Sequence, residues 1–90
     1  MAITAVIVKI MPSAPDTNLQ LIEDSAKELM EKEEAKNISF EIQDIAFGLK
    51  AIMMKFAWKE EKDTSIIEDA LSKIENVSSV QIVDYRRAFG

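Results

Sequence analysis

The sequence contains neither cysteine nor histidine, and it has only two glycines and two prolines among its 90 residues. Without cysteine there is no disulfide framework and no thiolate metal site, which fits a reducing compartment such as the cytoplasm. Without histidine the commonest general base and zinc ligand are missing, and a Ser-His-Asp triad is excluded. With Gly48 as the one internal glycine, neither a Walker loop nor a dinucleotide fingerprint fits. We therefore expect no catalytic residue, no metal and no cofactor.

A basic surface and a long hydrophobic run are also missing. The net charge of −5 argues against nucleic-acid binding, because phosphate neutralisation needs lysine and arginine in excess. No apolar run reaches the about 18 residues of a transmembrane helix, and the start lacks the basic region of a signal peptide. With 48% hydrophobic and 30% charged residues, the chain is predicted to be one cytoplasmic domain spanning residues 1–90, with no membrane partner.

Four strand-like segments are distinguished by how their apolar residues are distributed. Residues 2–10 and 49–58 are apolar on both faces, which is typical of central strands. Residues 38–43 and 80–85 alternate apolar and polar side chains, which is typical of edge strands. The segment after residue 85 is expected to be a short tail.

Two helical segments lie between these strands. In the first, residues 19–35, apolar side chains recur at helical spacing, after a proline-containing loop and a choice of capping residues. The second follows a polar turn at residues 59–63 and begins at Ser65, where Ser-Ile-Ile-Glu matches a capping box.

The element order β-α-β-β-α-β favours an α+β, ferredoxin-like fold, with a four-stranded antiparallel sheet and both helices on one face. The central strands of that fold are the first and third, which are the two that are apolar on both faces here. The other face of the sheet is then either a partner surface or shielded by lysine stems and Trp58. RNA-binding sheets share this fold, but the first strand has no aromatic residue for base stacking, so direct RNA binding is not expected.

Two features are left over as candidate binding residues. Phe47 and Gly48 lie between two strands, in a turn whose apolar residues replace the expected Asn, Asp or Ser. The turn is therefore predicted to face a partner, although a tight turn with a buried phenylalanine is the alternative. Arg86 and Arg87 form a positive spot near the end of a negatively charged chain. They are predicted to offer a mobile cation to a phosphate or carboxylate, with a solubility role or a contact at a helix end as the alternative.

The chain resembles the archaeal elongation factor 1-beta family, which is similar to the C-terminal exchange domain of its eukaryotic counterpart. The motifs that carry the resemblance are Val8-Lys9 before a proline-containing loop, Asp16 near the first helix, residues 45–51, residues 77–80 and residues 84–87, in this order. The resemblance implies a guanine-nucleotide exchange factor for the elongation factor 1-alpha GTPase. A ferredoxin-like regulatory or self-associating domain, forming a homo-oligomer without a GTPase partner, is the alternative.

The resemblance also implies which residues bind the partner. An aromatic in a Gly-aromatic-Gly turn of the eukaryotic relatives touches the GTPase, and Phe47 matches it, although alanine stands at the first glycine. A C-terminal lysine of those relatives reaches the magnesium and phosphate region, but this tail has none, and two arginines are the nearest cations. The expected contacts are Phe47, Gly48, Lys50, Arg86 and Arg87, with both groups directed toward the nucleotide pocket.

Overall fold

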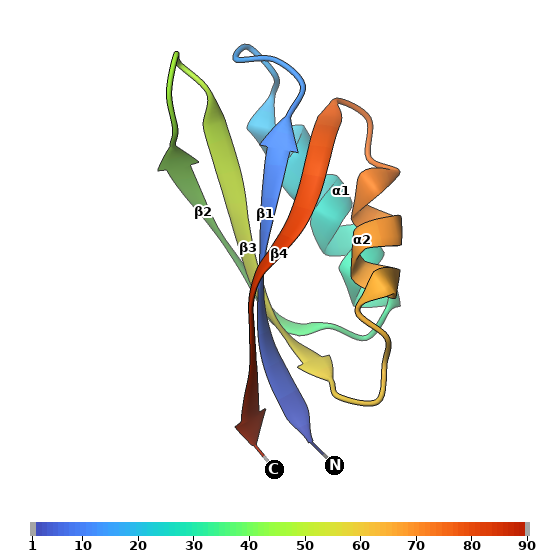
Figure 1. The fold of residues 1–90 in the computed structure, drawn as a ribbon. Coiled ribbons are helices and arrows are strands. Elements are labelled where there is room, and N and C mark those ends of the chain that lie inside the picture. The colour runs from blue at the N-terminus through green and yellow to red at the C-terminus, as the bar shows by residue number, and fades with distance from the viewer. Residues whose placement is uncertain (1, 90) are drawn as a thin grey trace.

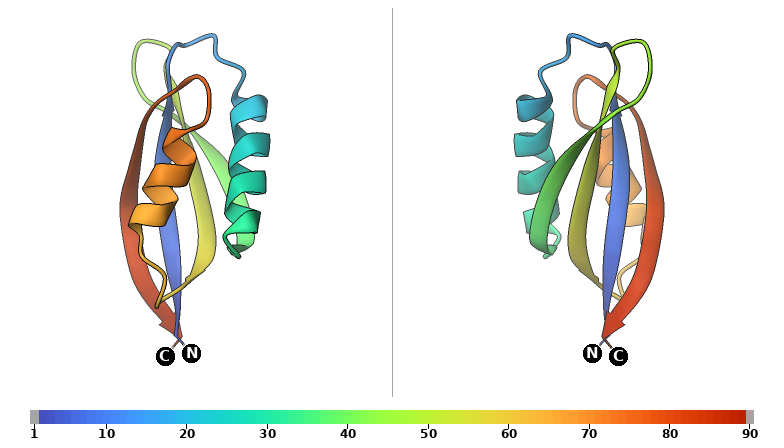
Figure 2. Two further views of the ribbon diagram at one scale, coloured as in Figure 1. Left: turned by 90° about the vertical axis from the view of Figure 1, so that its right-hand side faces the viewer. Right: turned by 90° about the vertical axis from the view of Figure 1, so that its left-hand side faces the viewer.

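The four strands form one antiparallel sheet in the order β2-β3-β1-β4 (Figure 1). The computed structural model describes residues 2–89. Both helices lie on one face of the sheet and leave the other face open, as the two side views show (Figure 2). The predicted ferredoxin-like fold is confirmed, with β1 and β3 in the centre. In chain order the elements are β1 (Ile3–Pro12), α1 (Leu19–Lys32), β2 (Lys36–Asp44), β3 (Lys50–Lys59), α2 (Ser65–Ser72) and β4 (Val77–Phe89).

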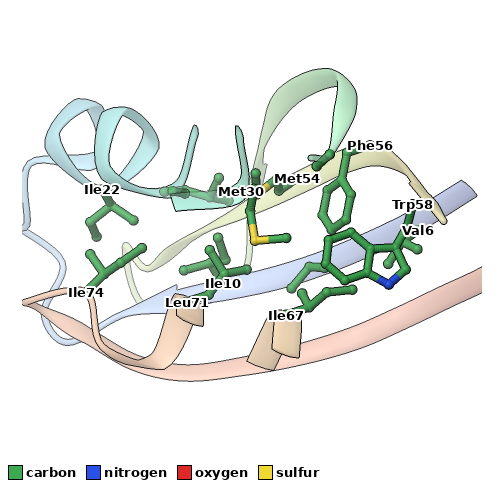
Figure 3. Close-up of a cluster of buried hydrophobic side chains, with 14 residues drawn as sticks. Val6, Ile10, Ile22, Met30, Met54, Phe56, Trp58, Ile67, Leu71 and Ile74 are labelled. Atoms are coloured by element: carbon green, nitrogen blue, oxygen red, sulfur yellow. The ribbon is translucent and has the colours of Figure 1, made fainter. Parts of the chain in front are cut away.

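The core fills the space between the sheet and the two helices. Alternate residues of β1 are buried against the helices, which is the period expected of a strand. Phe56 and Trp58 of β3 meet edge to face, with ring centroids 5.9 Å apart, and Met30 of α1 and Ile67 of α2 approach them (Figure 3). The core side chains, all at most 8% exposed, are Val6, Val8, Ile10, Ile22, Ala26, Met30, Ala35, Ile52, Met54, Phe56, Trp58, Ile67, Leu71 and Ile74.

The two helices begin at polar caps. The side chain of Asn18 accepts a hydrogen bond from the amide N–H of Gln20 at 3.0 Å, so Asn18 is the N-cap of α1. The predicted capping box of α2 is wrong, because the cap residue Thr64 makes no side-chain bond. Instead the carboxylate of Asp63 accepts the amide hydrogen of Ser65 at 2.9 Å. This bond lowers the pKa of Asp63, since it favours the charged form.

Both strands at the amino- and carboxyl-terminal ends of the chain are longer than predicted. β1 continues through Pro12, because its pairing with β3 ends at Ile10 and its last residues pair with β4 alone. β4 runs from Val77 to Phe89, so residues 77–79 of the predicted loop and residues 86–89 of the predicted tail are strand, while Gly90 lies outside the described residues. The reason is that β1 offers β4 a pairing edge from Pro12 opposite Val77 to Ile3 opposite Phe89, interrupted by three register shifts. The helix α1 is shorter than predicted and ends at Lys32.

The open face of the sheet is formed by the other residues of the central strands. Ile7 and Met53 lie on it and are half-buried, while Met54, whose side the sequence left undecided, lies in the core. The prediction that Trp58 shields this face is wrong, because its indole is 1% exposed and lies under the helices. Lys9 is half-buried on this face, as expected where a lysine stem covers apolar neighbours.

Candidate functional site

The connection between β2 and β3, which we call the Phe47 turn (residues 45–49), is a tight hairpin turn. The amide N–H of Leu49 donates to the carbonyl of Ala46 at 3.0 Å and closes it, and the amide N–H of Ile45 donates to the carbonyl of Leu49 at 2.9 Å. Both central residues have positive φ angles, 57° for Phe47 and 77° for Gly48. Two positive φ angles are characteristic of a type I′ turn, whose twist matches the twist of the strands that it joins.

Phe47 occupies a turn position that ordinarily selects asparagine, aspartate or glycine. For a residue with a Cβ atom, the left-handed region costs roughly 1–2 kcal/mol. The side chain recovers none of this by burial, since it is 98% exposed, and the alternative of a buried phenylalanine is wrong. Neither backbone preference nor packing therefore explains the residue within the isolated fold. A strained and exposed aromatic side chain is typical of a contact with another molecule.

The neighbours of Phe47 extend this exposed apolar surface. Ile42 at the end of β2 and Ile45 in the turn are 41% and 42% exposed. Ile42 lies on the core side of an edge strand, opposite the buried Ile52. Gly48 has no atom within 4 Å of an ideal Cβ position, so its backbone angle and not the available space requires glycine. Lys50 follows the turn and is exposed, opposite Asp44 in the ladder.

The second candidate region, which we call the arginine end, comprises Tyr85, Arg86 and Arg87. It is not a mobile tail as predicted, because these residues pair with β1 as part of β4. Successive side chains of a strand point to opposite faces. Arg87 lies opposite the buried Thr4 and therefore faces the helix side of the sheet, whereas Arg86 lies opposite Ala5 and faces the open side.

Each arginine of this end contacts a carboxylate. Arg87 donates from Nε to Oε2 of Glu60 at 3.1 Å, and its Nη2 contacts Oε1 of the same carboxylate. Arg86 donates from Nε to Asp84 at 3.2 Å, two residues away on the same strand. The hydrogen bond to Glu60, together with the charge of that carboxylate, holds the pKa of Arg87 above its ordinary value. The carboxylate contacts therefore orient both guanidinium groups in the fold.

The loop that carries Glu60 is tied to the carboxyl end of α1. Lys59 contacts Glu34 at 3.0 Å, and Lys62 contacts Glu33 at 3.2 Å. The hydrogen bond and the charge of Lys59 lower the pKa of Glu34. The ammonium group of Lys62 also lies 4.8 Å from the centroid of the core tryptophan ring. These contacts fix the position from which Glu60 reaches β4.

The two candidate regions lie at opposite ends of the sheet. Figure 1 shows the β2–β3 turn at the top and both chain termini at the bottom. From Lys50 to Trp58, which lies opposite Thr4 and hence level with Arg87, the strand rises about 26 Å at roughly 3.3 Å per residue. The expectation that both groups reach into one pocket is therefore wrong. The antiparallel order requires this result, because the turn lies where β1 ends and the arginines lie where β1 begins.

A metal site and a membrane-spanning helix are two further features that would bear on function. Within residues 2–89, no group of three or more acidic, histidine or cysteine side chains could hold a metal ion. None of the helices in this range has the length and apolar character needed to cross a membrane.

Comparison with known proteins connects this geometry to a family. The sequence profile of the EF-1 guanine nucleotide exchange domain matches residues 5–88, a range that includes both candidate regions. A protein named elongation factor 1-beta from Methanobrevibacter smithii is 38% identical over 80 residues, or 88% of this chain and 89% of that protein. Proteins of the same name from Methanocaldococcus jannaschii and Methanococcus maripaludis strain C6 are 36% and 33% identical over 78 residues, covering 86% of this chain and 88% of each relative.

Proposed function

Since this chain belongs to the EF-1 guanine nucleotide exchange domain family, whose members act in translation elongation, we propose that it binds the elongation factor 1-alpha GTPase through both ends of its sheet. Its function is nucleotide exchange during protein synthesis. In the proposed complex, binding speeds the release of GDP and allows GTP to enter. We further propose that residues 1–90 act as one exchange-factor domain in the cytoplasm, where elongation takes place.

The conformation of Phe47 is the observation that best supports this proposal. The ring is 98% exposed on a residue whose φ is 57°, so the fold carries a backbone cost without a packing gain. Burial of the ring in a pocket of the GTPase would provide that gain, at about 1.5–3 kcal/mol for a phenylalanine side chain. Ile42 and Ile45 would extend the apolar contact, and Gly48 would keep the turn in the shape that presents the ring.

The charged residues of the proposed contact lie at the two ends of the sheet. Lys50 flanks the Phe47 turn, and Arg86 and Arg87 stand at the other end of the sheet, about 26 Å away by strand rise. A GTPase that touches both ends must extend along the sheet. The arginine end would then meet carboxylate or phosphate groups, for which guanidinium is a planar, multiply donating partner.

The proposed mechanism requires selective binding and no bond-making chemistry. A GTPase holds its nucleotide through phosphate and magnesium contacts, and an exchange factor binds best to a state that has lost part of them. By linkage, the factor weakens the nucleotide as much as the nucleotide weakens the factor. A thousandfold faster release requires about 4 kcal/mol of such selectivity. A buried aromatic ring and a few ion pairs supply energies of this size.

The test is the release of labelled GDP from elongation factor 1-alpha with increasing amounts of this protein. We expect acceleration that saturates, and a weaker effect for Phe47→Ala at equal concentration. Release that stays unchanged at saturating protein would refute the proposal. Size-exclusion chromatography with and without the GTPase tests the alternative of a self-associating domain, which predicts a homodimer and no mixed complex.

A further inference from the structure

The contact between Arg87 and Glu60 joins two segments that are far apart in the sequence. Glu60 lies in the loop between β3 and α2, and Arg87 lies near the end of β4. The guanidinium meets the carboxylate through Nε and Nη2, so two of its five N–H donors are used and three remain. Contact through two nitrogens fixes the plane of the guanidinium and not only its distance.

Glu60 can orient another side chain because its own backbone is held. Its amide N–H donates to the carbonyl of Ala2 at 3.1 Å. On the other side of the loop, Nε1 of the buried Trp58 donates to the carbonyl of Lys62 at 3.1 Å. The backbone of the loop that carries Glu60 is therefore held by the core tryptophan on one side and by Ala2, just before β1, on the other.

The surface beside this pair is hollow. A cavity of about 430 Å³ is lined by Lys62, Thr64, Ile82 and Tyr85, between the loop and β4. Tyr85 is 43% exposed and lies two residues before Arg87, on the same face of the strand. A group that docks in this hollow would contact Tyr85, which shares its face of β4 with Arg87.

The two arginines of this end are held in different ways. Arg86 faces the open side of the sheet and contacts only Asp84 of its own strand among the described ion pairs. Arg87 is held by a residue of another segment, and this contact restricts its rotamers before any partner arrives. A side chain that is already ordered loses less conformational entropy when it binds.

Resting on the proposed exchange function, we propose that Glu60 is a positioning residue, which orients Arg87 so that its remaining N–H donors bind an anionic group of the GTPase–nucleotide complex. That group is either a carboxylate of the GTPase or a phosphate of the nucleotide. In this arrangement Arg87, and not Arg86, makes the productive contact.

The test compares Glu60→Gln with the matched control Glu61→Gln in GDP release at saturating protein. Glu61 is the next residue of the same loop, is exposed, and forms no ion pair in the described part of the chain. We expect Glu60→Gln to reduce the maximal acceleration about two- to fivefold, the range expected of an exposed ion pair, and the control to leave it unchanged. Equal rates for both variants would overturn the proposal.

A charge-swapped variant, Glu60→Arg with Arg87→Glu, separates positioning from stability. The double variant restores the ion pair with the two charges exchanged. Its melting temperature should therefore lie closer to that of the wild type than the melting temperatures of the single variants do. If Arg87 serves to present a cation from β4, nucleotide exchange by the double variant stays slow. Recovery of both the melting temperature and the exchange rate would show a purely structural role. If the wild type itself fails to accelerate release, the exchange function is refuted independently of either variant.

Binding measurements identify the anionic group. If Arg87 meets a carboxylate of the GTPase, Arg87→Ala weakens binding to the nucleotide-free and GDP-bound GTPase alike. If it meets a phosphate of a nucleotide that is already partly displaced, the variant slows GDP release at saturating protein and leaves binding to the nucleotide-free GTPase unchanged. Unchanged binding to the nucleotide-free form together with unchanged GDP release would contradict the assignment of Arg87.

Discussion

Replacing Phe47 by asparagine should stabilise the isolated protein while it impairs nucleotide exchange. Phe47 has a φ of 57° and is 98% exposed, so the substitution removes backbone strain and sacrifices no packing. Asparagine tolerates the left-handed region and is preferred in type I′ turns. If about half of the 1–2 kcal/mol cost is recovered, the free energy of unfolding rises by roughly 0.5–1 kcal/mol.

This gain is large enough to measure in a chain of this length. At about 2.1 cal/mol/K per residue, the unfolding entropy of 90 residues is about 190 cal/mol/K. A gain of 0.5–1 kcal/mol therefore raises the melting temperature by about 3–5 °C. Loss of the aromatic ring from the complex costs about 1.5–3 kcal/mol, or roughly 10- to 150-fold in affinity for the GTPase.

Phe47→Ala is the matched control for this experiment. Alanine has no ring but retains a Cβ atom, so it keeps the backbone strain of phenylalanine. We expect both variants to weaken GDP release to the same extent, and only the asparagine variant to melt at a higher temperature in circular dichroism. A lower melting temperature for the asparagine variant would refute the assigned strain. Normal exchange by both variants would refute the assigned contact.

Two further predictions concern the core and the pH dependence of stability. Met54→Ala should cost about 2–5 kcal/mol in chemical unfolding because Met54 is fully buried, whereas Met53→Ala on the open face should cost less than about 1 kcal/mol. Burial, and to a lesser extent the charge of Asp24, raises the pKa of Glu23 above 4.5, so this carboxyl favours the fold when protonated and loses that contribution as the pH rises through its folded-state pKa. Glu23→Gln should therefore raise the melting temperature at pH 7 and have no effect below pH 4.5, and a pH-independent difference would contradict the shift.

The fold was predictable because its two central strands differ in pattern from its two edge strands. β1 and β3 are apolar on both faces. One face meets the helices, and on the open face side chains such as Ile7 and Met53 are half-buried. The ends of the strands were harder to predict. Residues such as Ser79 and Arg86 have no strand pattern of their own and are ordered by pairing with β1, which local sequence does not encode.

The candidate site was predictable where it depends on local chemistry. Apolar residues around one glycine in a turn indicated that Phe47 faces outward, and the structure places it there. Glu60 was missed because it belongs to a polar turn, and its partner Arg87 lies 27 residues further along the chain. The separation of the two ends was also missed, although it follows from the strand order once that order is known.

The separation of the two ends has a consequence for how the protein tolerates change. The Phe47 turn extends beyond the last paired residues of β2 and β3, and the arginine end lies at the far end of the same sheet, so neither region contributes a side chain to the core. Substitutions at Phe47 or Arg87 therefore change binding with little loss of stability. Because β1 pairs with both β3 and β4 along nearly its whole length, the two ends are joined through one hydrogen-bonded sheet. A partner that engages one end finds the other at a fixed distance, which favours binding at both ends without new contacts between them.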